Sequence, residues 1–225
     1  MLTDLWPLFG LVLRTPRLEL RLPSLRQLAG LGELAAEGVH DPAVMPFLTP
    51  WTDKPPKERA RSVLQWQWRE WAELSADKWS LGFVVLREDD VVGTQELGAT
   101  DFAVVREVGT GSWLGRRHQG RGIGTEMRAA VLHLAFAGLG ARQATSGAFA
   151  DNPASLTVSR KLGYRPDGVR HRKRREEEAA VELRLRLDRA AWEAHRTVPV
   201  EIGGLEPCLP LLGATAAVAP GAPGS

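Results

Sequence analysis

The sequence is poor in cysteine, tyrosine and lysine, and it has no long apolar run. Its one cysteine, Cys208, excludes an intramolecular disulfide framework and a thiolate cluster for zinc or iron–sulfur. No apolar stretch approaches the ~18 residues that a membrane span needs, so we expect no membrane association. Only five of the 29 basic residues are lysine, and the net charge of +2 is too small to indicate nucleic-acid binding.

The N-terminal segment lacks the features of a secretory signal. Asp4, Trp6 and Pro7 interrupt any continuous apolar core, and no basic region precedes them. With 44% hydrophobic and 25% charged residues, the composition is that of a globular protein rather than a disordered one. We therefore expect a soluble chain in a reducing compartment, the cytoplasm.

The hydrophobic pattern predicts a mixed α/β domain without internal repeats. Leu18, Leu20 and Leu22 alternate with charged residues, as in a half-buried strand, and Ser24 is a typical N-cap for the helix that follows. We expect strands at about 18–22, 79–87, 91–97, 107–114, 143–149, 165–174 and 179–187, and helices at about 24–38, 57–75, 123–140, 152–163 and 188–195. This order excludes a repeated βαβ ladder. We expect one domain over residues 1–212, followed by a flexible Ala/Gly/Pro-rich tail over 213–225.

The most informative stretch is a glycine-rich turn between a predicted strand and a predicted helix, residues 114–126. The first N–H groups of a helix have no partner within it and lie at the positive end of its dipole, and glycines let the main chain approach a diphosphate. The turn ends in Gly-Ile-Gly-Thr instead of Gly-Lys-Ser/Thr, which disfavours ATP or GTP. Gly120, Gly122 and Gly124 also lack the spacing of the dinucleotide fingerprint. A plain tight turn is the alternative interpretation.

Three motifs follow one another at suitable distances. They are Thr15-x-Arg17-Leu18 in the first strand region, Gln119-x-x-Gly122-x-Gly124 in the turn, and Asn152-x-x-Ser155 with a closing Leu162-Gly163-Tyr164. Together they give the sequence a resemblance to the GNAT superfamily of N-acetyltransferases, in particular to its ribosomal-protein alanine acetyltransferase branch. The resemblance spans about residues 13–195, and the sequence is also similar to bacterial members described as succinyl-CoA-binding.

The resemblance implies a GNAT fold, in which a central, mostly antiparallel twisted sheet splays at the acyl-CoA site and carries helices on both faces. It implies acetyl-CoA or succinyl-CoA as co-substrate, and no metal. In that fold the main chain from Gly120 to Thr125 holds the pyrophosphate, and the N–H of Leu114 lies near the thioester carbonyl. The cofactor-binding residues that we predict are Leu114, Arg116, Arg117, Gln119, Gly120, Arg121, Gly122, Ile123, Gly124, Thr125, Asn152 and Ser155.

Catalysis needs a group that protonates the departing thiolate and a base for the amine. Many superfamily members use a tyrosine for the first role, but Ser159 occupies that position, and the resemblance therefore points to Ser155. A serine there can instead satisfy the local backbone. For the base we consider Glu96 and Asp101, with Glu107 as a further candidate, and each can also be a plain surface carboxylate.

Tryptophans are dense in the first third of the chain. Leu64, Trp68 and Trp71 share one helical face, which favours core packing for the two tryptophans. We predict that Trp51 and Trp66 form an aromatic wall of the acceptor pocket.

Two functions remain open on these observations. The first is an N-acyltransferase that moves an acetyl or succinyl group from acyl-CoA to an amine by direct attack in a ternary complex. The second is an acyl-CoA-binding sensor without turnover, suggested by the absence of the tyrosine. The basic segment 170–175 raises a nucleic-acid reading, but three glutamates follow it at once, so we expect a charged hairpin arm instead. The amine acceptor, a small molecule or a protein N-terminus or lysine, is not defined by the sequence, and family resemblance implies a homo-oligomer, a dimer.

Overall fold

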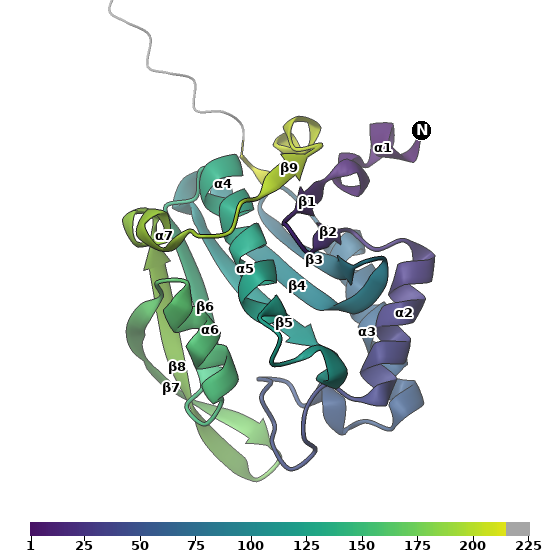
Figure 1. Cartoon of the computed structure of the whole chain (residues 1–225), viewed down its shortest axis with the longest axis vertical. Coiled ribbons are helices and arrows are strands. Elements are labelled where there is room, and N and C mark those ends of the chain that lie inside the picture. Colours follow the sequence, from purple (N-terminus) through teal and green to yellow (C-terminus); the bar gives the residue numbers. More distant parts are fainter. Residues whose placement is uncertain (215–225) are drawn as a thin grey trace, which may run out of the picture.

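The computed structural model describes residues 1–214, which form a single nine-stranded sheet with helices on both faces (Figure 1). The strand order is β7-β8-β6-β5-β4-β3-β2-β1-β9, and β5–β6 is the parallel pair among the pairs of this sheet. The strands are β1 Val12–Arg14, β2 Glu19–Arg21, β3 Lys78–Arg87, β4 Asp90–Thr100, β5 Glu107–Leu114, β6 Gln143–Phe149, β7 Arg165–Arg175, β8 Glu178–Asp188 and β9 Glu201–Gly203. This architecture confirms the predicted mixed, mostly antiparallel sheet.

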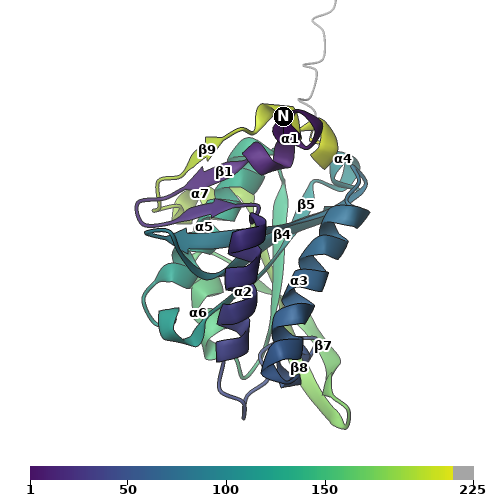
Figure 2. The same cartoon turned by 90° about the vertical axis from the view of Figure 1, so that its right-hand side faces the viewer.

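The helices cover opposite faces of the sheet. They are α1 Leu2–Leu5, α2 Leu25–Glu37, α3 Pro56–Glu73, α4 Phe102–Val105, α5 Ile123–His133, α6 Pro153–Lys161 and α7 Arg189–His195. Figure 2 shows α2 and α3 side by side over one face, whereas α5 and α6 lie over the other in Figure 1. No helix within residues 1–214 combines the length and the apolar character required to cross a membrane.

Alternation along β3 builds two hydrophobic cores. Leu81, Phe83 and Val85 pack in the larger core, which includes α5, while Val84 and Leu86 pack in the smaller core with α2 and α3. Because successive strand residues point to opposite faces, a strand that is apolar at nearly every position must be covered on both sides. The near-continuous hydrophobic run of β3 is explained in this way.

Local signals fixed the starts of two helices. Ser24 accepts a hydrogen bond from the N–H of Gln27, and the Gln27 side chain accepts one from the N–H of Ser24, so α2 begins with a capping box. Asn152 Oδ1 accepts from the N–H of Ser155 at 3.1 Å, and Pro153 takes the first helical position of α6. Both helix starts are where the sequence predicted them.

Helix α1 and three further short elements were not predicted. Strands β1 and β9 have three residues each and pair with each other at one edge of the sheet, and α4 has four residues between β4 and β5. Leu212 accepts a hydrogen bond from Trp79 Nε1, and Ala214 is buried, so the start of the predicted tail packs on the core. The remainder of the predicted tail, 215–225, lies outside the described residues.

The predicted core role of Trp68 is wrong, because its side chain is 46% exposed. Trp71 does pack against the larger core and meets Phe9 edge-on, with ring centroids 5.4 Å apart. The helical periodicity of α3 therefore predicted core packing correctly for Trp71 and wrongly for Trp68.

The basic segment 170–175 lies on β7 and pairs with β8 in a long hairpin. Arg172 pairs with Glu182, Arg174 with Asp151, and Arg175 with Asp53. These acidic partners neutralise much of the local positive charge, in agreement with the expectation of a charged hairpin arm.

The position of the site is set by a divergence of two strands. β5 pairs with β4 as far as Leu114, but it pairs with β6 only at Glu107, Val108 and Gly109. Beyond Gly109, β6 stays with β8 while β5 leaves it. The sheet is therefore splayed along residues 110–114, where β5 has no β6 partner.

Candidate functional site

The glycine turn leads from β5 into α5. Gly120 and Gly122 have φ of +72° and +80°, a conformation that favours glycine, and Gly122 is the N-cap of α5 without any side-chain cap. Within residues 1–214, the N–H groups of residues 120–124 donate to no other residue, whereas those of Thr125 and Glu126 donate to the Gly122 carbonyl. The turn thus presents a run of unused donors at the positive end of a helix, which is the chemistry of an anion site.

This corner of the molecule is not filled by the protein's own side chains. A Cβ added at Gly120 would meet no atom within 4 Å, and one at Gly124 would make only ordinary contacts. A Cβ at Gly122 would lie 3.3 Å from Arg17 Nη2. The turn is therefore open to a ligand, with an arginine at its edge.

Arg17 is a site residue that the sequence reasoning did not name, although it lies within the Thr15-x-Arg17-Leu18 motif. Its Nε donates to Glu126 Oε2 at 2.6 Å and its Nη1 donates to the Arg121 carbonyl at 3.2 Å, while Thr15 Oγ1 donates to Glu126 Oε1 at 2.6 Å. Glu126 is buried in the first turn of α5. The segment before β2 is thereby fixed to the turn, and it places a half-exposed guanidinium beside the free N–H groups.

The other predicted cofactor residues divide into two groups. Gln119 Nε2 donates to the Val39 carbonyl at 2.6 Å and to the Leu114 carbonyl at 3.0 Å, so its side chain shapes the turn rather than facing a ligand. Arg116 and Arg121 are exposed, and Arg117 is paired with Glu37. The predicted phosphate contacts are thus spatially feasible for Arg116 and Arg121, whereas Arg117 already has a partner.

His118 lies in the same turn and accepts from Arg117 Nε at 3.1 Å. Partial burial lowers the pKa of His118, and the charges of Arg117 and Arg121 lower it further. The imidazole is therefore kept neutral and adds no charge to the turn at neutral pH.

Asn152 and Ser155 lie at the start of α6, across the splay from the turn (Figure 1). The Asn152 side chain is occupied as a helix cap. The hydroxyl of Ser155 is half-buried and makes no hydrogen bond to another residue within residues 1–214. Of the two, Ser155 has the free donor that proton transfer needs.

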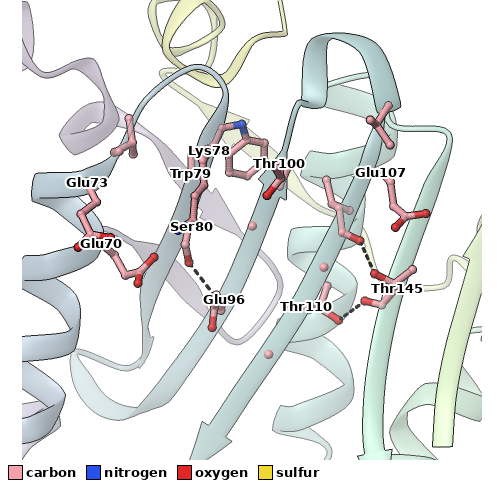
Figure 3. Close-up of a pocket in the computed structure, with 17 residues that line it drawn as sticks. Glu70, Glu73, Lys78, Trp79, Ser80, Glu96, Thr100, Glu107, Thr110 and Thr145 are labelled. Carbon is pink, nitrogen blue, oxygen red and sulfur yellow. Dashed lines mark hydrogen bonds between the residues drawn. The ribbon is translucent and has the colours of Figure 1, made fainter. Parts of the chain in front are cut away.

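A cavity of about 520 Å³ opens where β5 leaves β6, on the α3 side of the sheet (Figure 3). It is lined by Glu70, Glu73, Leu74, Lys78, Trp79, Ser80, Glu96, Gly98, Ala99, Thr100, Val105, Glu107, Val108, Gly109, Thr110, Gly111 and Thr145. Four carboxylates and one ammonium group are therefore gathered around one space. We call it the acceptor-side pocket.

Glu96 lies in the wall of this pocket on β4, opposite Gly111 of β5. Its Oε1 accepts a hydrogen bond from Ser80 Oγ at 2.8 Å, which fixes the carboxylate (Figure 3). A Cβ at Gly111 would lie 3.1 Å from Glu96 Oε2, so the glycine leaves room for this side chain. Burial raises the pKa of Glu96 above the ordinary value, the Ser80 hydrogen bond opposes this, and the charge of Glu70 adds to the rise.

The remaining predicted residues are not all brought to the pocket. Glu107 lines it, but Asp101 does not: it is exposed and precedes α4 in a left-handed conformation. Trp51 contacts Phe47 and Trp113 in the smaller core. The structure therefore leaves Asp101 and Trp51 outside the wall of this pocket.

Trp66 is also absent from the pocket wall. Its ring lies against Gly82 of β3, where an added Cβ would be 2.9 Å from the ring. Two carboxylates that do line the pocket, Glu70 and Glu73, were not predicted, because only the packing of α3 against the sheet brings them there.

No cluster of three or more metal-ligating side chains is found in the part of the chain that the structure describes.

The family model of the acetyltransferase (GNAT) domain matches residues 17–165. Among solved structures, RimJ of Mycobacterium smegmatis in complex with CoA-disulfide has a TM-score of 0.64 and 20% identity, over 82% of this chain and 90% of that one. RimL, a ribosomal alpha-N-protein acetyltransferase in complex with coenzyme A, has a TM-score of 0.60 and 18% identity, over 79% and 97%. A chimera of the spermidine N-acetyltransferase SpeG from Vibrio cholerae and hSSAT has a TM-score of 0.62 and 16% identity, over 79% and 98%.

The splayed sheet and the glycine turn define an acetyltransferase fold of the coenzyme A-binding type. The chain belongs to the GNAT acetyltransferase family, since the family model covers well over half of it. These structural neighbours, at 16–20% identity, share the fold of this chain.

Proposed function

We propose that this protein transfers an acyl group, acetyl or succinyl, from acyl-CoA to a positively charged amine, by direct attack in a ternary complex. The observation that carries the proposal is the arrangement around residues 110–114 of β5. Unused N–H donors lie at the end of this segment, and a carboxylate-lined pocket lies at its beginning. An extended thioester that binds along the unpaired edge of β5 would place its phosphates at the unused N–H donors and its acyl group at the carboxylate-lined pocket.

The donor would be held mainly by the main chain. Residues 120–125 would bind the pyrophosphate, with Arg116 and Arg121 adding positive charge. The unpaired edge of β5 up to Leu114 would offer backbone groups to the rest of the donor and to the thioester carbonyl. The open space at Gly120 and Gly124 fits this role.

The acceptor would bind in the acceptor-side pocket. None of Glu70, Glu73, Glu96 and Glu107 forms an ion pair with another residue within residues 1–214. Negative charges that lack partners attract a cation, and a primary amine is cationic at neutral pH. The pocket therefore favours amines that carry at least one further positive charge.

Glu96 would act as the base. A lysine-type amine with a pKa of about 10.4 is almost entirely protonated at neutral pH, so a proton must leave before attack. Glu96, with its raised pKa, would take this proton directly or through water. The amine nitrogen would then form a bond to the thioester carbon, and the C–S bond would break. The Ser155 hydroxyl would give its proton to the departing thiolate and would regain one, directly or through water, from the nitrogen, which loses its extra proton as the amide forms.

Isothermal titration with acetyl-CoA and succinyl-CoA tests the donor side, and we expect micromolar-range binding of at least one. Thiol release with spermidine, a ribosomal-protein N-terminal peptide and a neutral-tailed monoamine then tests the acceptor side. We expect the polycationic acceptor to react faster than the monoamine. Absence of binding by both thioesters would refute the proposal.

A sensor that binds acyl-CoA without turnover is the second candidate, favoured by Ser159 at the position where a tyrosine is common in the superfamily. Ser159 is buried and its hydroxyl is engaged with Arg128 and the Ser155 carbonyl. Binding without thiol release for every amine, in the wild type and Ser155→Ala alike, would favour the sensor. We propose the cytoplasm on the globular composition and the single cysteine, and a homodimer on family resemblance alone. Gel filtration with light scattering tests the dimer.

A further inference from the structure

Ser80 of β3 lies between two carboxylates of the acceptor-side pocket. Its Oγ donates to Glu96 Oε1 on the neighbouring strand β4 at 2.8 Å, and Glu70 of α3 approaches the same hydroxyl from the other side (Figure 3). Ser80 is buried and Glu70 is half-buried, whereas Glu73 and Lys78, which line the same pocket, are exposed. The row of three side chains therefore leads from Glu96 to the exposed end of α3.

The hydroxyl of Ser80 has one proton to donate and lone pairs that accept. When both carboxylates are ionised, Ser80 can donate to only one of them, and the other faces a lone pair. When the row gains one proton, both contacts are satisfied, because the protonated carboxyl donates to Ser80 while Ser80 donates to the ionised carboxylate. The row therefore has two forms with the same hydrogen-bonding pattern, which differ in whether Glu96 or Glu70 holds the proton.

The charges around the row also favour one shared proton. Besides Glu70 and Glu96, the charged groups of the pocket are Glu73 of α3, Lys78 of β3 and Glu107 of β5. None of the five forms an ion pair in the part of the chain that the structure describes. Burial raises the pKa of both Glu70 and Glu96, and the charge of Glu70 raises the pKa of Glu96 further. The pair thus holds a proton more readily than two separate surface glutamates do.

Each turnover of the proposed reaction leaves a proton on Glu96, and this proton must depart before the next amine is deprotonated. The bound amine occupies the pocket in front of Glu96, whereas Ser80 contacts its Oε1 and Gly111 lies on the side of its Oε2. The terminal torsion of a glutamate is broad, so rotation of the carboxyl group brings an acquired proton to Ser80. A path for the proton away from the substrate is therefore present.

Resting on the proposed function, we propose that Ser80 and Glu70 form a proton relay for Glu96, which carries the proton of the acceptor amine to solvent. Glu96 gives its proton to Ser80 Oγ, while the original hydroxyl proton of Ser80 passes to the Glu70 carboxylate. Two O–H bonds break and two form, the hydroxyl is regenerated, and Glu96 is ionised again. Glu70 then releases the proton to water. Glu96 remains the group that contacts the amine, and the other two act through it.

The test measures kcat at constant pH and ionic strength over a series of imidazole concentrations, with an enzyme-free blank at each. The donor is acetyl-CoA or succinyl-CoA, and the amine is the member of the panel above that the wild type acylates fastest. We expect Ser80→Ala and Glu70→Gln to lower kcat about tenfold or more, and imidazole to restore much of it by carrying the proton directly. The wild type should not respond to imidazole. Ser80→Thr, which keeps a hydroxyl, should recover most of the kcat that Ser80→Ala loses.

Glu73→Gln is the matched control, because it removes the same charge from the same pocket one helical turn away from Glu70. Its kcat should not respond to imidazole. The acidic limb of kcat gives a second measurement. It should move to lower pH in Glu70→Gln, which removes a charge that raises the pKa of Glu96, and to higher pH in Ser80→Ala, which removes a hydrogen bond that lowers it.

The relay would be overturned if Ser80→Ala and Glu70→Gln kept the kcat of the wild type. It would also be overturned if their lowered kcat did not respond to imidazole, which is the behaviour of residues that only shape the pocket. Glu70→Gln changes a half-buried side chain and gives an answer even if Ser80→Ala does not fold. Either negative result with an active wild type leaves the proposed function in place, whereas absence of thiol release by the wild type would refute that function.

Discussion

At the scale of single residues, the carboxylate of Glu96 is held in a state that suits proton transfer. It is fixed by Ser80, is given room by Gly111, and has its pKa raised by burial and by the charge of Glu70. A base with a pKa raised toward the working pH accepts a proton more readily than an ordinary glutamate does.

We predict that Glu96→Gln lowers kcat by about 10²- to 10⁴-fold, because an amide cannot accept the proton. In the wild type, kcat should fall as the pH drops through the raised pKa of Glu96, since the carboxylate becomes protonated there. The variant should lack this acidic limb. Steady-state kinetics across the pH range from 5 to 9 measure both, and an unchanged acidic limb in Glu96→Gln would show that another group is the base.

The raised pKa of Glu96 also affects stability, in the opposite direction to its effect on kcat: a rise in pH favours kcat and lowers the free energy of unfolding. A carboxyl whose pKa is higher in the folded state binds more protons when folded, so its contribution to the free energy of unfolding decreases as the pH rises from the ordinary glutamate value through the raised one. Glu96→Gln should remove this dependence. Urea unfolding at several pH values would detect the difference.

At the scale of elements, the glycine turn can be tested against a second glycine with the same backbone conformation. Gly122 and Gly140 have φ of +80° and +73°, so alanine should cost about 1 kcal/mol of unfolding free energy at either position. Only Gly122→Ala should weaken acyl-CoA binding, because Gly140 lies in the connection to β6, away from the turn. Titration and urea unfolding of both variants measure this, and equal CoA affinities would contradict a main-chain cradle at the turn.

The elements that carry their own local signals could be predicted from the sequence. β5 and β6 begin and end where the pattern placed them, because glycines and charged residues bound them on both sides. β1 and β9 were not predicted. β9 has only three residues and forms by pairing with β1, which is almost two hundred residues away in the sequence, whereas β1 lacks the alternation that marks its neighbour β2. A strand that forms by long-range pairing, as β9 does, could therefore be recognised only in the structure.

The candidate site divides in the same way. The turn around Gly122 was predicted because its signal is contiguous. Glu70 and Glu73 of the pocket were not, because the contact between α3 and the sheet joins residues far apart in the sequence.

At the scale of the whole molecule, charge is distributed asymmetrically about the sheet. The turn side carries the exposed Arg116 and Arg121, while the acceptor-side pocket carries four carboxylates and Lys78. A protein with a net charge of only +2 thus presents opposite signs to its two proposed substrates.

We predict that Glu70→Gln/Glu73→Gln raises KM for a diamine about threefold to tenfold, because exposed charge pairs contribute up to ~1 kcal/mol each. The KM for acyl-CoA should not change. Glu176→Gln/Glu177→Gln, in the exposed turn between β7 and β8, makes the same change in net charge and is the control. Equal effects of the two double variants would mean that only overall charge matters.

Because β9 pairs with β1, the sheet can be completed only late in the synthesis of the chain. Residues 12–14 emerge early, yet their outer neighbour, residues 201–203, is made nearly two hundred residues later. A nascent chain that has reached residue 195 already holds every proposed site residue, but its β1 still has a bare edge, and the segment bearing buried Cys208 and Leu212 is missing. Synthesis must therefore continue well beyond the last proposed site residue before β9 can pair with the free edge of β1.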